Sequence, residues 1–266
     1  MGSKPVGAAA LTGRLPQLRR AAAERAEAER LAFHRSGGPL VAVCGLAGGA
    51  GTSTLAYLLA RRAARHSSVP VLLAELDAAT GLAALAGAAS PLGLRELAVA
   101  VDEGRAPDPP FAEAAGGLRL IATTKPDDSD AVPPEPLARL LEDARTAHGL
   151  VVIDAGQPTP GNTVLTRADQ ALLCLPATKA GTRRAELQLT AGLLRGLAAG
   201  ARSALVCSAT QPRARAQVRQ LRRLAQDRVD RLLLVPHVPQ LAAGKLDEPA
   251  FESTLTELAT LLRSPR

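Results

Sequence analysis

The feature that most constrains this chain is a glycine-rich turn between a strand-like run and a helix-like run. The apolar run Val41–Cys44 is followed by four glycines within seven residues (45, 48, 49 and 51), by hydroxyl residues at 52–54, and by a helix-forming segment from 55 to 65. Glycines let the backbone approach a ligand closely, and the free N–H groups at a helix start bind anions. The stretch therefore predicts a strand, a tight turn and a helix start that together cradle a phosphate.

This turn has the form of a P-loop without its lysine, because Thr52 stands where the motif has Lys. Ser53 keeps the hydroxyl position that ligates Mg²⁺ in such loops. Losing one charge-assisted contact costs roughly 1.5–3 kcal/mol of binding, and losing a preorganised charge slows catalysis by on the order of 10²–10³. We therefore expect weak ATP or ADP binding and little hydrolysis. The predicted nucleotide-binding residues are Gly48, Gly49, Ala50, Gly51, Thr52, Ser53 and Thr54.

Carboxylates follow two other predicted strands. The strand at 70–75 runs into Glu75-Leu76-Asp77, and the apolar run from Leu150 ends in Asp154. Beside a P-loop, such carboxylates hold Mg²⁺ directly or through water, or orient the attacking water. We expect Ser53, Glu75, Asp77 and Asp154 around any Mg²⁺, with Asp77 and Asp154 as the catalytic candidates if the site is active. Each carboxylate alone is better explained as a turn or helix-cap residue, and it is their occurrence together with the turn, in this order along one α/β chain, that favours a P-loop site.

The order of segments predicts one doubly wound α/β domain. Strands are expected at 40–44, 70–75, 118–122, 150–154, 171–175, 203–207 and 231–235, and helices at 54–65, 93–103, 135–147, 180–199, 212–226 and 250–263. Short apolar strands alternating with helices imply a mostly parallel sheet covered on both faces, with ligands at the carboxyl ends of the strands. We expect an N-terminal arm at 1–38, disordered and then helical, and the domain at 39–266.

The composition of the chain indicates what kind of partner it can contact and in which cell compartment it is expected. A net charge of +7 makes contact with a polyanion plausible without naming it. The three cysteines lie inside apolar runs, which indicates buried, reduced thiols in a cytoplasmic protein. The uncharged stretch from Ser36 to Ala60 is long enough to span a bilayer. Its central glycines and hydroxyls favour the turn instead, and no integral membrane span is expected.

On these residues the chain resembles the MinD/ParA superfamily of P-loop ATPases, and within it the CpaE/TadZ-type proteins of pilus assembly and septum-site systems. The superfamily pattern Lys-Gly-Gly-x-Gly-Lys-Thr-Thr is similar to residues 47–54, with Ala47 and Thr52 in place of both lysines. The Asp-x-Asp motif resembles 75–77, followed by Gly81-Leu82, and the strand ending in Asp matches Asp154. The segment Cys207-Ser208-Ala209 stands where the family has the Asn that follows a strand, so the family's adenine specificity does not carry over.

The resemblance implies a nucleotide-dependent positioning or assembly factor. Its expected partner is a protein of a secretion, pilus or division machine, and the family forms sandwich homodimers in which the first lysine reaches the partner's phosphates. Recruitment to the cell pole, septum or nucleoid follows from the same resemblance. An active ATPase completed by a partner's Arg, or a DNA-binding module of the partition type, stay open as alternatives.

The nucleic-acid alternative rests on one arginine-rich helix. The candidate contacts are Arg213, Arg215, Arg219 and Arg222, of which the last three share a helix face. A row of arginines binds phosphates without reading sequence, but the same pattern describes a solvated amphipathic helix that packs through Val218, Leu221 and Ala225. The last helix carries an apolar stripe from Phe251 to Leu262 and lacks a basic flank, so core packing is expected there.

Overall fold

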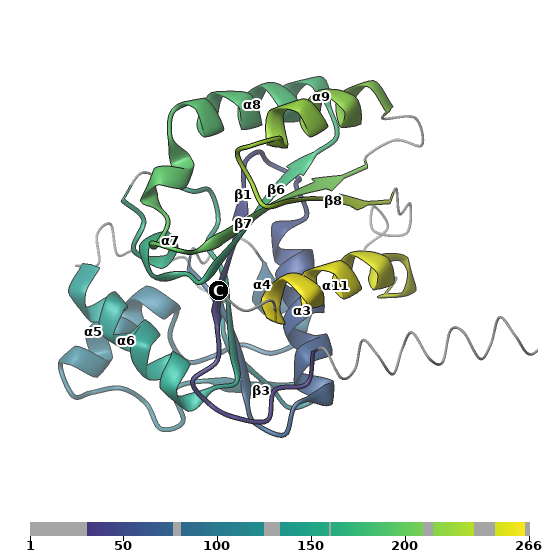
Figure 1. Cartoon of the computed structure of the whole chain (residues 1–266). Coiled ribbons are helices and arrows are strands. Elements are labelled where there is room, and N and C mark those ends of the chain that lie inside the picture. Colours follow the sequence, from purple (N-terminus) through teal and green to yellow (C-terminus); the bar gives the residue numbers. More distant parts are fainter. Residues whose placement is uncertain are drawn as a thin grey trace, which may run out of the picture.

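A single eight-stranded sheet organises the chain in the computed structural model, which describes residues 31–76, 81–124, 134–159, 161–209, 215–236 and 248–263. The strand order is β3-β4-β2-β5-β1-β6-β7-β8, and every neighbouring pair is parallel except β3 with β4 (Figure 1). The strands are β1 Leu40–Gly45, β2 Val71–Glu75, β3 Ala112–Ala114, β4 Leu118–Ile121, β5 Leu150–Asp154, β6 Gln170–Pro176, β7 Arg202–Ser208 and β8 Arg231–Val235.

Helices cover both faces of this sheet (Figure 1). One face carries α3 Thr52–His66, α4 Leu82–Ala86 and α11 Glu248–Arg263. The other carries α5 Leu94–Asp102, α6 Pro134–Ala147, α7 Thr163–Arg167, α8 Lys179–Thr190, the short 3₁₀ helix η1 Leu193–Gly196 and α9 Arg215–Ala225. The predicted doubly wound, mostly parallel α/β fold is confirmed.

The continuous apolar strands follow from this double cover. In β1, Val41 and Val43 enter the core under α3, whereas Leu40, Ala42 and Cys44 enter the core on the opposite face. Because successive side chains of a strand point to opposite faces, a strand buried on both sides has no polar alternation. The cysteines predicted to be buried and reduced are indeed buried and free.

All predicted strands are present, and the departures are short elements and one helix end. The edge strand β3 and the five-residue helices α4 and α7 were not predicted, because segments this short carry no measurable hydrophobic period. The helix expected at 180–199 ends at Thr190. Gly192 follows with a φ of 89°, a left-handed conformation that stops the helix, and η1 continues the chain.

The described end of the N-terminal arm packs on the domain. Leu31 is fully buried in the core under α3, and the Phe33 amide donates to the Ser67 hydroxyl at 3.0 Å. Gly38 leaves no room for a side chain, since a Cβ there would lie 1.6 Å from the Gly149 carbonyl oxygen. Residues 1–30 lie outside the described chain, so the arm and its boundary at 38 stay predictions.

The membrane alternative and the last helix are settled by the packing. Residues 36–60 contribute β1, the turn and the start of α3, and among the described residues no helix is long and apolar enough to cross a bilayer. The stripe of α11, Phe251, Leu255, Leu258 and Leu262, lies in the core beside α3, as expected.

Candidate functional site

The glycine-rich turn lies at the carboxyl end of β1, where the fold places it against two neighbouring strands. The Gly45 amide donates to the Gly156 carbonyl at 2.8 Å, and the Leu46 amide donates to the Cys174 carbonyl at the same distance. Leu46 and Ala50 are buried, while Gly48 and Gly49 are exposed. Two apolar anchors therefore hold the turn down and leave its glycine backbone open to solvent.

The start of α3 supplies the second half of the cradle. Its N-cap is Gly51, with a φ of 80°, so no side chain caps the helix, and its first turn contains no acidic residue. The first intrahelical bond runs from the Leu55 amide to the Gly51 carbonyl at 2.9 Å. The backbone amides before Leu55 have no acceptor within the helix. They lie at the positive end of the helix dipole, which favours the binding of an anion.

The Thr52 side chain packs against the backbone at the start of the turn. A Cβ built on Gly45 would come within 2.8 Å of the Thr52 hydroxyl oxygen, so this hydroxyl fills the space beside the Gly45 backbone. A side chain at position 45 would have to displace this hydroxyl. Position 52 brings no positive charge to the cradle, which agrees with the weak binding that the sequence predicts.

Two buried carboxylates stand at the carboxyl ends of the adjacent strands. Glu75 and Asp154 are register partners in β2 and β5, and their side chains are 2% and 0% exposed. By strand alternation both face the α3 side of the sheet, two residues beyond Leu73 and Val152 of that core. Each accepts a backbone N–H at 3.4 Å, Glu75 from Leu82 and Asp154 from Gly156.

The carboxylate oxygens of these two residues are of the type that binds Mg²⁺ in proteins. Mg²⁺ takes oxygen ligands and is held by one or two carboxylates together with phosphate oxygens and water. The register places Glu75 beside Asp154, and the Gly45–Gly156 hydrogen bond holds the residues after Asp154 against the start of the glycine-rich turn, which ends at Gly51 where α3 begins. Asp77 lies outside the described residues, and within those residues no group of three or more His, Cys, Asp or Glu side chains is placed to hold a metal.

The buried thiol beside this site is inert. Burial, together with the smaller effect of the nearby charge of Asp154, raises the pKa of Cys44 to about 12. A thiol with that pKa stays protonated at neutral pH and is neither a nucleophile nor a metal ligand. Cys44 is therefore a core residue.

Ser208 is a site residue that the sequence did not single out as a support. Its hydroxyl donates to the Ala50 carbonyl at 3.0 Å and so ties the end of β7 to the turn. In the sequence, Ser208 is recognisable only as a polar residue at the end of an apolar strand. The order of the strands in the sheet is needed to show that it reaches the glycine-rich turn.

The arginine-rich helix lies on the other face of the sheet from the carboxylates. In α9, Leu221 and Ala225 are buried in the core, while Arg219 and Arg222 are exposed. The amphipathic packing is therefore confirmed. Arg213 lies outside the described residues and the side chain of Arg215 is not described, so contact with nucleic acid stays a prediction.

No protein-family model and no curated protein sequence matches this chain. Solved structures match its fold. The ParA family ATPase from Chlorobium tepidum TLS has a TM-score of 0.66 at 16% sequence identity, over 84% of this chain and 98% of that one. The cobyrinic acid a,c-diamide synthase from Mycobacterium smegmatis, with bound ATP analog and magnesium, gives 0.64 at 20% identity, over 85% of this chain and 94% of that one.

A chain of the MinC:MinD cell division protein complex of Aquifex aeolicus gives a TM-score of 0.64 at 15% identity, over 86% of this chain and 97% of that one. The protein thus has the fold of ParA- and MinD-type ATPases. At these identities the likeness establishes the fold alone.

Proposed function

We propose that the protein is a nucleotide-binding positioning or assembly factor of the CpaE/TadZ kind, which binds ATP or ADP with Mg²⁺ weakly and hydrolyses ATP slowly or not at all. One observation carries this proposal: an uncapped helix start and a glycine turn lie beside the buried pair Glu75 and Asp154, and no lysine follows the last glycine.

In this assignment the backbone binds the phosphates. The N–H groups from Gly48 to Thr54 surround the anion and the α3 dipole adds a favourable field. Ser53, Glu75 and Asp154 hold Mg²⁺, which shields the phosphate charge when bound. Asp77 and Asp154 orient a water if turnover occurs. Because Thr52 is neutral, it cannot stabilise the negative charge that develops on the phosphate in the transition state, and hydrolysis is slow.

The partner is a protein of a pilus, secretion or division machine, with a homodimer as the working form. Fold neighbours support this class: one is the MinC:MinD cell division complex, and another is a plasmid partition protein of Borrelia burgdorferi bound to AMPPNP. A site that binds nucleotide without rapid turnover suits a protein whose nucleotide state governs assembly or recruitment to pole, septum or nucleoid.

Calorimetric titration with ATP and ADP, with and without Mg²⁺, tests the binding. Gly48→Asp places a carboxylate in the cradle at a position where a Cβ meets nothing within 4 Å, so the variant repels phosphate without a clash. Gly196→Asp, also with open space around its Cβ, is the matched control. We expect saturable, Mg²⁺-enhanced binding by the wild type and by Gly196→Asp, and none by Gly48→Asp.

Turnover is measured on the same proteins. A basal ATPase rate matching an intact family member, and lost in Ser53→Ala, would overturn the slow-hydrolysis part of the proposal. A rate that rises only when a partner protein is added supports the alternative in which a partner's Arg replaces the lysine.

A second candidate, nonspecific DNA binding, is favoured by one surface. Arg219 and Arg222 on α9 are exposed, as are Arg183 and Arg184 on the adjacent helix α8. Contacts to phosphates release counterions, so such binding weakens steeply with salt. Replacing Arg219 and Arg222 with Gln would then lower DNA affinity and flatten its salt dependence, whereas unchanged affinity would remove this candidate.

A further inference from the structure

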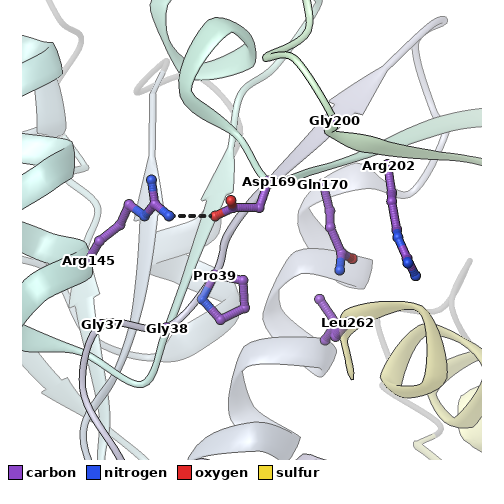
Figure 2. A pocket seen from close by; sticks show the side chains of 9 residues that line it. All are labelled: Gly37, Gly38, Pro39, Arg145, Asp169, Gln170, Gly200, Arg202 and Leu262. Atoms are coloured by element: carbon purple, nitrogen blue, oxygen red, sulfur yellow. Dashed lines mark ion pairs between the residues drawn. The ribbon is translucent and has the colours of Figure 1, made fainter. Parts of the chain in front are cut away.

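A cavity at the amino end of the sheet is explained by contacts within its own wall (Figure 2). Asp169 accepts the Leu40 amide at 2.9 Å, and its carboxylate is also paired at 2.9 Å with the Arg145 guanidinium. Arg145 lies in addition 3.6 Å from a carboxylate oxygen of Glu142. These charged groups tie the loop before β1 to α6 and β6, so their role is structural.

A second cavity, of about 450 Å³, lies between the loop that follows β5 and the end of α8. One wall comes from residues 158, 159, 161 and 162 and from Leu165 of α7, and the other from Gln188 of α8 and residues 191–193, 195 and 196 around η1 (Figure 1). Pro158 and Leu165 are buried, and Leu193 packs on the core of this face of the sheet. A largely apolar cavity of this volume is in the range of small-ligand sites.

Arg195 is the charged side chain of this cavity. The described lining residues include no carboxylate, and Arg195 forms no ion pair with another described residue. Its side chain lies along the backbone of Gly192, where a Cβ would come within 3.1 Å of Arg195 Cδ and 3.2 Å of its Nε. The glycine that follows α8 thus leaves room for the guanidinium at the cavity. A guanidinium is matched in shape and charge by a carboxylate.

Gln188 brings an unsatisfied hydrogen-bond acceptor to the same wall. Its Oε1 is buried and accepts no hydrogen bond from the described residues. A buried acceptor without a donor costs free energy. The last torsion of a glutamine side chain is broad, so the amide can turn this oxygen toward a donor in the cavity. Because Gln188 and Arg195 both line the cavity, a molecule that fills it contacts both residues.

We propose that this cavity binds a small, largely apolar organic acid that also carries an N–H or O–H donor. The apolar body packs on Pro158, Leu165 and Leu193. The carboxylate faces Arg195, and the donor reaches Gln188 Oε1. Burial of the apolar body supplies most of the binding free energy, because an ion pair with an exposed arginine contributes little by itself. The assignment does not depend on nucleotide binding, since none of these residues belongs to the glycine-rich turn or to the carboxylate pair.

Three probes of similar size test each group in turn. Indole-3-acetate has the acid and a ring N–H, benzofuran-3-acetate has an oxygen in place of the N–H, and indole-3-acetamide lacks the charge. Each is titrated into the whole chain at neutral pH and followed by calorimetry and by the NMR shifts of the Gly161, Gly192 and Gly196 amides. We expect saturable binding of indole-3-acetate. The other two should each bind about three- to ten-fold more weakly, the effect of one hydrogen bond or one exposed ion pair.

Substitutions locate the binding. Arg195→Gln should lower the affinity for indole-3-acetate to that for the acetamide, while Arg223→Gln, which removes an equal charge from the exposed face of α9, leaves it unchanged. Gln188→Leu should bring the affinities for the indole and benzofuran acids together. Gly196 lines the cavity and a Cβ there meets nothing within 4 Å, so Gly196→Phe should fill the cavity and abolish binding. If Gly196→Phe does not fold, Arg195→Gln locates the site.

Four results would overturn the proposal. Absence of saturable shifts with indole-3-acetate means that the cavity takes no such acid. Equal affinity for the acid and the acetamide removes the contact with Arg195, and equal affinity for the indole and benzofuran acids removes the contact with Gln188. Glycine shifts that follow the protein concentration instead of the probe would make the cavity an interface between copies of this chain.

Discussion

Replacing Thr52 with lysine restores the charge that the nucleotide site lacks. Thr52 is the first residue of α3, half-buried, with its hydroxyl packed beside Gly45. A lysine keeps the Cβ position and extends past this contact toward the exposed glycines. One charge-assisted contact contributes roughly 1.5–3 kcal/mol, and each 1.4 kcal/mol is a factor of ten. We therefore expect Thr52→Lys to bind ATP about ten- to a hundred-fold more tightly than the wild type.

The same substitution has an opposite effect on the protein without nucleotide. A cation in the first turn opposes the helix dipole by about 0.3–1 kcal/mol, so the unliganded variant unfolds at slightly lower urea. Nucleotide binding then reverses the loss, because a ligand that binds only the folded state stabilises it. Tighter binding together with lower unliganded stability is a pair of changes that improved packing alone would not produce.

Calorimetry with Mg²⁺-ATP measures the affinity, and urea unfolding with and without ATP measures the stability. Thr52→Met, which is long and uncharged, is the matched control and should leave the affinity near the wild-type value. If Thr52→Lys is folded and binds ATP no more tightly than Thr52→Met, the cradle does not hold a phosphate and the reasoning fails.

Three further predictions concern the supports of the fold and the site. Ser208→Ala removes the hydrogen bond to the Ala50 carbonyl and should weaken ATP binding by up to about ten-fold, at a stability cost near 1 kcal/mol, as measured by calorimetry and urea unfolding. Burial lowers the pKa of His148 below its ordinary value of 6.5, and the charge of Arg119 lowers it further, against the hydrogen bond to a helix carbonyl. Stability is therefore full above pH 6.5 and falls as the pH drops below it; urea midpoints from pH 8 to 5 should show this slope and lose part of it in His148→Gln. Leu258→Ala opens a cavity between α11 and the sheet and should cost about 2–5 kcal/mol of unfolding free energy, whereas a loss below 1 kcal/mol would mean that α11 is not part of the core.

Local patterns along the chain are enough to predict the layered fold and the glycine-rich turn. Strands such as Leu150–Ile153 are apolar throughout because both faces are covered, and that pattern is readable without a structure. The glycines followed by hydroxyl residues likewise predict the anion cradle from the sequence. This works because the backbone conformation of a turn and the start of a helix depend on residues that are neighbours in sequence. The absence of lysine at position 52 is equally a property of the sequence.

Which residues from distant segments meet cannot be read from local patterns and depends on how the strands are ordered in the sheet. Glu75 and Asp154 become neighbours because β2 lies beside β5, and Ser208 reaches Ala50 because the end of β7 lies close to the turn that follows β1. The sequence indicates that a strand ends in a polar residue, but strand order depends on how crossovers pack. The same holds for the amino-end cavity, where Asp169 binds the amide of Leu40 across 129 residues of chain. Contacts of this kind follow from packing a whole sheet, which no local pattern encodes.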